Sequence, residues 1–199
     1  MNSFRQFILF SLILVLSSCT HKPTMEPVKI QKDSRIVLIG NNLGSRMMEY
    51  GDFDTELQTR FPDYNLFIRN ICSPGNTPGF RPHPSRNSPW AFPGAEKFNP
   101  EFDINTGSEG HFPTEDEWLI ELKPDVILGF FGYNESFRGP EGIEDFKGEI
   151  AAFIDHTNSQ DYNGGKGTTL VLISPIAFED LTDTYDLPDG KEFNKNIQL

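Results

Sequence analysis

The sequence has little cysteine, an excess of acid over base, and only one long apolar run. Cysteine occurs twice in 199 residues, at Cys19 and Cys72, which excludes a disulfide framework and a CxxC metal site. Lysine and arginine total 17 against 29 acidic residues, a formal net charge of −12. A surface this negative repels nucleic acid and anionic lipid headgroups. The expected partners are small molecules, glycans or proteins, and no nucleic acid.

What the chain does contain is enough apolar material for one packed domain. Hydrophobic residues make up 37% of the sequence and include 18 phenylalanines, so a core can form and wholesale disorder is excluded. The length suits a single domain. Cys72 is expected to be a small buried apolar residue, with a reactive thiol as the less favoured alternative.

The N-terminal residues have the pattern of an export signal. Arg5 precedes an apolar run, Phe7 to Leu16, that only Ser11 interrupts. At about ten residues the run is too short to cross a bilayer as a helix, and it has the size of a signal-peptide core. It ends in Leu-Ser-Ser-Cys19, which resembles a lipobox. The alternative is an ordinary secretory signal in which Cys19 has no special role. Either kind of signal would export the protein from the cytoplasm.

The lipobox resemblance implies cleavage before Cys19 and lipid attachment to its thiol. Thr20 follows the cysteine, whereas an Asp there commonly retains such lipoproteins at the inner membrane. The expected location is therefore the cell envelope, at the outer membrane facing the periplasm, with membrane contact through the lipid only. We divide the chain into a signal peptide (1–19), a tether (20–34) and one domain (35–199).

The domain alternates strand-like and helix-like segments. Four apolar stretches are typical of strands: Arg35–Ile39, Asn65–Arg69, Val126–Phe131 and Thr168–Ile173. Helical periodicity separates them, in a stripe of Tyr50, Phe53, Leu57 and Phe61, a capping box at Thr114–Glu117 with Pro124 beyond it, and a pattern over Ile143–Ile154. Glu192–Leu199 indicates two turns of a further helix. This order predicts an α/β domain with a flavodoxin-like, doubly wound parallel sheet.

Ligands of such sheets bind beyond the carboxyl ends of the strands, so the residues that follow each strand matter most. Gly40-Asn41-Asn42-Leu43 follows the first strand. Asn70-Ile-Cys-Ser-Pro-Gly75-Asn76-Thr77 follows the second. Gly132-Tyr-Asn134-Glu135 follows the third.

These three blocks, in this order, resemble those of the SGNH or GDSL hydrolases over residues 35–199. The resemblance implies the SGNH hydrolase fold and a site that stabilises negative charge on a carbonyl oxygen. Carried over by position, its donors are the main-chain N–H of Asn42, the main-chain N–H of Gly75 and the side-chain Nδ2 of Asn134.

The sequence departs from the family at its catalytic positions. Asn42 stands where the family has its nucleophilic serine, and an amide cannot replace a hydroxyl nucleophile. Asn41 replaces the aspartate of the same block. Ser45 lies about one helical turn further on, about 5 Å along the axis, too far to substitute.

The family's Asp-x-x-His block is absent as well. Asp155 and His156 are adjacent, and His156 is expected to interact with the end of a helix. We therefore expect the domain to be C-terminally incomplete. The chain also resembles the N-terminal SGNH-like module of large secreted bacterial proteins that continue into a sorbosone-dehydrogenase-like propeller and a cytochrome c domain.

The segment Asn76–Pro113 is rich in proline and lacks a clear period. Long loops of this kind usually bind or dock, so its clustered side chains, which could overhang the site, are binding candidates: Arg81, His83, Arg86 and Trp90. A proline-stiffened lid over the sheet edge is an equal alternative, and His83 as a substitute base is a weaker one. No other His or Cys lies near enough to favour zinc, and no cofactor or metal is expected.

Two functions remain. In the first, the domain is a catalytically degenerate hydrolase that binds a small molecule or glycan, or docks to downstream domains of the same polypeptide. In the second, it is an active carbohydrate or lipid esterase that uses a non-serine nucleophile or an activated water, with a histidine from a region outside these residues.

Overall fold

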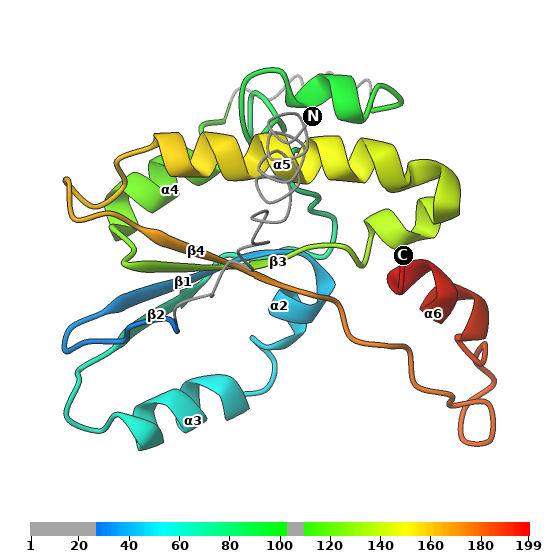
Figure 1. Cartoon of the computed structure of the whole chain (residues 1–199), viewed down its shortest axis with the longest axis horizontal. Coiled ribbons are helices and arrows are strands. Elements are labelled where there is room, and N and C mark those ends of the chain that lie inside the picture. The colour runs from blue at the N-terminus through cyan, green and yellow to red at the C-terminus, as the bar shows by residue number, and fades with distance from the viewer. Residues whose placement is uncertain (1–26, 103–109) are drawn as a thin grey trace, which may run out of the picture.

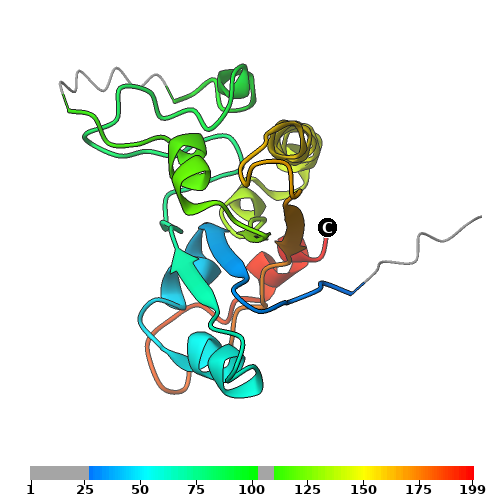
Figure 2. The same cartoon turned by 90° about the vertical axis from the view of Figure 1, so that its left-hand side faces the viewer.

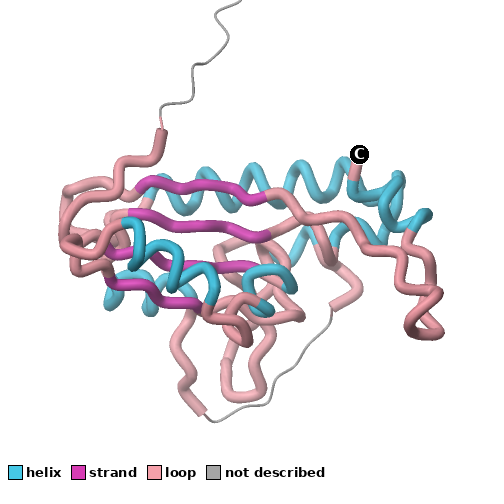
Figure 3. The backbone as a smooth tube through the Cα atoms, turned by 90° about the horizontal axis from the view of Figure 1, so that it is seen from below, coloured by secondary structure: helices cyan, strands magenta, loops and turns pink. Residues whose placement is uncertain are grey.

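A computed structural model describes residues 27–102 and 110–199. Its centre is a parallel sheet of four strands, β1 (Arg35–Gly40), β2 (Phe67–Asn70), β3 (Val126–Phe130) and β4 (Thr169–Ile173). The strand order is β2-β1-β3-β4, and every neighbouring pair is parallel. Figure 3 shows the four strands side by side. This is the order expected of a flavodoxin-like sheet: β2 is added on one side of β1, and β3 and β4 are added on the other.

Helices cover both faces of the sheet. α4 (Glu115–Leu122) and α5 (Ile143–Ser159) lie over one face, and α2 (Asn42–Arg46) and α3 (Asp52–Arg60) lie under the other (Figure 1). The protein is therefore an α/β domain of the doubly wound type, as the sequence predicts. In the described part of the chain, no helix is both long and apolar enough to cross a membrane.

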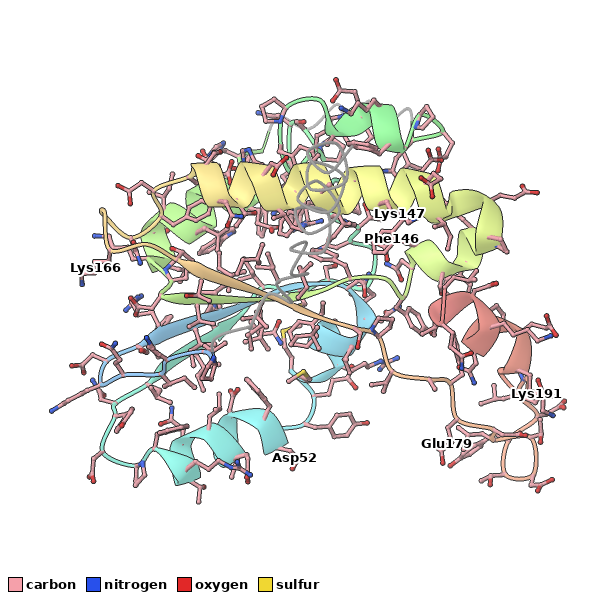
Figure 4. The ribbon with its side chains drawn as sticks, viewed as in Figure 1. Asp52, Phe146, Lys147, Lys166, Glu179 and Lys191 are labelled. Atoms are coloured by element: carbon pink, nitrogen blue, oxygen red, sulfur yellow. The ribbon has the colours of Figure 1, made fainter. Side chains whose placement is uncertain are left out.

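β1 explains the two layers, because its side chains alternate between two cores. Val37 and Ile39 pack on the α5 side with Phe153, whereas Ile36 and Leu38 pack in the core on the α2 and α3 side. All four are fully buried, so a continuous apolar strand is required at this position. Figure 4 shows Phe146 on the side of α5 that faces the sheet.

Two predicted elements begin later than the sequence pattern indicates. β2 starts at Phe67 and not at Asn65, because Asn65 has a φ of 50° and belongs to a turn, where its side chain donates to Asp33. α3 starts at Asp52, so Tyr50 is outside the helix and 63% exposed. The other members of that apolar stripe do pack against the sheet.

α4 begins with the predicted capping box. Glu117 N–H donates to the Thr114 hydroxyl at 3.3 Å, and Thr114 N–H donates to the Glu117 carboxylate at 2.7 Å. The helix ends at Leu122, where Lys123 takes a left-handed conformation just before Pro124. The predicted C-terminal helix is α6 (Lys191–Ile197), which packs against the 3-10 segment Glu135–Gly142.

The segment between β2 and α4 lies on the same side of the sheet as α4 and α5. Figure 2 views α5 nearly end-on and shows the described parts of this segment beyond α4. It contains one short 3-10 helix, Ala95–Phe98. Of the predicted tether, the structure describes residues 27–34, where Asp33 N–H donates to Tyr64 O and Ile30 packs against the core. The predicted signal peptide and Cys19 lie outside the described residues.

Candidate functional site

The site begins where β1 ends in a turn that only glycine can make. Gly40 has a φ of 124°, and a Cβ added there would lie 2.3 Å from the carbonyl oxygen of Phe130 on β3. The next amide, Asn41 N–H, donates to that same oxygen at 2.8 Å. This close approach buries Asn41 and places Asn42 as the first residue of α2.

Three loops meet at the side chain of Asn134. Asn42 Nδ2 donates to Asn134 Oδ1 at 3.0 Å. Asn134 Nδ2 donates to Pro74 O and to Asn76 O, each at 2.8 Å. These carbonyls flank Gly75, so the loops after β1, β2 and β3 come together as expected for neighbouring parallel strands.

The loop after β2 is also fixed to the end of β1. The carbonyl oxygen of Gly40 accepts from Ser73 N–H at 2.9 Å and from Asn76 Nδ2 at 3.2 Å. A single carbonyl therefore holds both ends of the Ser73–Asn76 turn. The position of Gly75 follows from these contacts and from those of Asn134.

The three amide donors named in the sequence differ in their hydrogen bonding. Among the described residues, neither Asn42 N–H nor Gly75 N–H donates a hydrogen bond. Both hydrogens of Asn134 Nδ2, in contrast, are taken by main-chain carbonyls. Two donors are thus open to a ligand, and the third holds the loop together.

Asn42 and Gly75 line two different hollows. Asn42 lines one of about 270 Å³ together with Tyr133 and Ile176. Gly75 and Asn134 line another, of about 210 Å³, together with Glu135. The hydrogen bond between Asn42 and Asn134 therefore links a residue that lines one hollow to a residue that lines the other.

Glu135 is a buried carboxyl group next to Asn134. Its Oε2 accepts from Gly132 N–H at 2.7 Å and from Asn41 Nδ2 at 3.4 Å. Its Oε1 is buried and has no hydrogen-bond partner among the described residues. Burial raises the pKa of Glu135 to about 7, and the hydrogen bond from Gly132 N–H offsets part of that rise. The group also lines an apolar hollow of about 380 Å³ beneath α5.

The long loop is held to α5 by one buried carboxylate. Glu149 Oε1 accepts from the Thr77 hydroxyl at 2.6 Å, from Gly79 N–H at 2.8 Å and from Asn99 Nδ2 at 2.9 Å. Glu149 is 2% exposed. Three donors from the loop that converge on one buried oxygen of α5 specify the loop conformation.

Arg81 and Arg86 are built into the structure of this loop. Arg81 is 2% exposed and forms a bidentate ion pair with Glu115 of α4. Arg86 donates to Pro113 O at 3.0 Å and to Arg81 O at 2.7 Å. Arg81 can contact a ligand only through those guanidinium N–H groups that do not donate to Glu115.

His83 stacks on Phe112 with ring centroids 3.6 Å apart, and its Nδ1 accepts from Ser85 N–H. It lines a hollow of about 240 Å³ beside β2 together with Arg81 and Arg86. Trp90 is not part of that lining and packs against Phe80. The hollow shares Ser73 and Asn76 with the loop after β2 but includes neither Asn42 nor Asn134, so its side chains form a neighbouring site.

None of the three described histidines contacts Asn42. His156 pairs with Asp116 at 2.8 Å, in the last turn of α5, at the opposite end of the sheet from α2 (Figure 1). His111 is exposed and lies 3.6 Å from Glu117. Cys72 is buried, and burial raises the pKa of its thiol, as expected of an unreactive cysteine.

Sequence reasoning did not identify Glu135, Asn76 or Glu149 as contributors to the site. Glu135 follows Asn134 directly in the block after the third strand, so its position was a usable signal. Glu149 gives no such signal, since it is one acid among many on a helix with an apolar stripe. In the described ranges, no group of His, Cys, Asp or Glu side chains is arranged to hold a metal ion.

Comparison with known proteins yields one structural similarity. No protein-family model matches the sequence, and no curated protein matches it either. The chain is similar to a solved structure of a gut microbial diltiazem-metabolizing enzyme, with 18% sequence identity and a TM-score of 0.49. The superposition covers 88% of this chain and 34% of that one, so the chain spans about a third of that enzyme's length.

Proposed function

We propose that this chain is an SGNH-hydrolase-like domain that has lost its nucleophile and binds a ligand in place of cleaving it. One observation carries the proposal: the side chain at the nucleophile position, Asn42, is an amide that donates its hydrogen bond to Asn134. An amide nitrogen cannot attack a carbonyl as a serine hydroxyl does. No histidine among the described residues contacts it to act as a base.

The features that remain suit recognition of an oxygen atom. The main-chain amides of Asn42 and Gly75 have no acceptor of their own in the described structure. Each of these N–H groups can donate to a carbonyl or carboxylate oxygen, as main-chain amides do in acyl-transfer enzymes, from the hollow that its residue lines. The proposed ligand is a small molecule or a glycan carrying such an oxygen, or a downstream domain of the same polypeptide.

The same proposal places the domain at the cell envelope. A lipid on Cys19 would hold it at the outer membrane, facing the periplasm, through the segment that precedes β1. The acidic surface would then disfavour contact with anionic headgroups, so that the lipid alone provides attachment.

Hydrolysis of p-nitrophenyl acetate and of acetylated sugars by the full chain tests this function. The expected rate is that of buffer alone, and a gain of activity in Asn42→Ser would support the loss of a nucleophile at this position. Asn158→Ala, an exposed asparagine on α5, is the matched control for Asn134→Ala. A parent protein that turns over at about 10 s⁻¹, typical of enzymes, and loses this activity in Asn134→Ala alone would contradict the proposal.

A second candidate is an ester hydrolase that activates water. Glu135 favours it, because a carboxyl group with a pKa of about 7 and an unpartnered oxygen lies beside Gly75 and Asn134. In that case the Asn42→Ala variant should still hydrolyse the ester, and the Glu135→Gln variant should not. Loss in both variants, or in neither, argues against this mechanism.

A further inference from the structure

A hollow beside the edge strand β2 combines positive charge with aromatic surface in an acidic protein. It measures about 240 Å³ and is lined by residues of β2, of the segment that follows β2 and of α4. We call it the β2-edge pocket and define it by six of its lining residues: Arg69, Ser73, His83, Arg86, Phe112 and Trp118.

The pocket holds two arginines without a carboxylate partner. No acidic oxygen lies within 4.0 Å of the guanidinium of Arg69 or Arg86 in the described chain, whereas the neighbouring Arg81 is neutralised by Glu115. Burial lowers the pKa of Arg86, and the nearby carboxylates of Glu115 and Glu117 offset part of that shift. Where 29 acids outnumber 17 bases, this local excess of positive charge is unusual.

Residues that line the pocket also carry hydrogen-bond donors that have no acceptor among the described residues. His83 Nδ1 accepts from Ser85 N–H, so in the neutral ring the proton is on Nε2, which becomes a donor. Trp118 Nε1–H, the Ser73 hydroxyl and Arg86 Nη2 donate to no other described residue. The carboxylate of Glu115 already receives two hydrogen bonds from Arg81. A ligand that satisfies these groups must be rich in acceptor oxygens.

Aromatic rings form one wall of the pocket. His83 and Phe112 are stacked, and Trp118 lies 6.3 Å from Phe112 between ring centroids. The Arg86 guanidinium lies over the Phe112 ring, 5.2 Å from its centroid, so the aromatic surface left for a ligand with a ring is that of His83 and Trp118. The volume is below the roughly 300 Å³ at which pockets for drug-sized ligands begin, so the ligand must be small.

We propose that the β2-edge pocket binds a small ring-shaped ligand that carries a carboxylate or another oxyanion group. Arg69 and Arg86 hold the charged group, because a guanidinium matches the two oxygens of an oxyanion. The neutral donors of His83 and Trp118 bind further oxygens. This inference does not depend on the proposed function, since Asn42, Gly75 and Asn134 are not part of the pocket.

Titration calorimetry of the full chain tests the proposal with three probes: glucuronate, glucose and inorganic phosphate. Glucuronate is expected to bind at least tenfold more tightly than glucose, and more weakly at high salt. Arg69→Gln should weaken binding of glucuronate by at least tenfold. Arg60→Gln is the matched control, because Arg60 is an exposed arginine on the other face of the sheet.

Arg86→Gln should have the same effect, but Arg86 also bonds to two carbonyls, so the exposed Arg69 gives the cleaner result. Phosphate binding that also depends on Arg69 supports an oxyanion site that does not require the ring. Failure of both anions to bind, or equal affinity of the parent and Arg69→Gln, overturns the proposal. Loss of glucuronate binding in Asn42→Ser but not in Arg69→Gln would locate the binding in the crevice at Asn134 and overturn the proposal.

Discussion

Asn42 and Asn134 share a hydrogen bond of 3.0 Å between side-chain amides that come from the ends of two neighbouring strands. Asn134 accepts this bond at Oδ1, and its Nδ2 donates to the carbonyls of Pro74 and Asn76. The contact therefore ties three loops into one unit at the carboxyl edge of the sheet. A site of this kind is rigid before any ligand arrives, which favours binding.

Replacing Asn134 with alanine should loosen the loop after β2. The change removes three hydrogen bonds, and at about 1 kcal/mol each, with partial replacement by water, it should cost about 2 kcal/mol of unfolding free energy. Amide hydrogen exchange of residues 73–77 should become faster, while that of β1 should change less. Unchanged exchange in the loop would show that Asn134 does not hold it.

Glu135 should make the stability of the protein depend on pH. Its pKa is about 7 in the folded protein against an ordinary value of 4.5. The folded state therefore binds the proton more tightly, and the stability that this provides is complete below pH 4.5 and lost as the pH rises through 7. The total is about 3 kcal/mol.

Thermal or urea unfolding between pH 4 and pH 8 measures this dependence. In Glu135→Gln, which cannot ionise, stability should fall less over the same range. If parent and variant decline in parallel, another group causes the effect.

Glu115→Gln should destabilise the fold strongly. The variant leaves the guanidinium of Arg81, which is 2% exposed, without its carboxylate. Breaking one side of a buried ion pair typically costs about 3–5 kcal/mol, because an uncompensated charge remains buried. Urea denaturation measures the loss. Glu56→Gln, which breaks an exposed pair with Arg60, is the matched control and should have little effect.

Cys19→Ala should move the protein from the membrane fraction to the soluble fraction of cells that express the full gene. The prediction follows from the lipobox resemblance, since only the thiol of Cys19 can accept the lipid. Cys72→Ala is the control, because that cysteine is buried and should not affect fractionation. Membrane association that persists in Cys19→Ala would contradict the predicted lipid anchor.

The sheet could be predicted from the sequence because each strand is an apolar run ended by glycine, proline or asparagine. The errors are at element ends, where backbone conformation decides: Asn65 belongs to a turn although its side chain fits the strand pattern. The three loops that meet were predicted for the same reason, as parallel strands end at one edge.

Contacts between distant residues could not be predicted in this way. Nothing in the spacing shows that Asn134 donates to carbonyls about sixty positions earlier, or that Arg81 is buried against Glu115. Arginine in a proline-rich loop is typical both of binding surfaces and of buried ion pairs. The structure gives Arg81 the second role and leaves Arg69, which the sequence did not single out, facing the pocket.

The attachment of the long loop to Glu149 determines how a ligand can reach the β2-edge pocket. Thr77, Gly79 and Asn99 all donate to the same buried oxygen, so lifting the loop would break three hydrogen bonds to Glu149 at once. Entry should then require no movement of this attached part of the loop. Association should accordingly be fast, with a single kinetic phase and no slow conformational step.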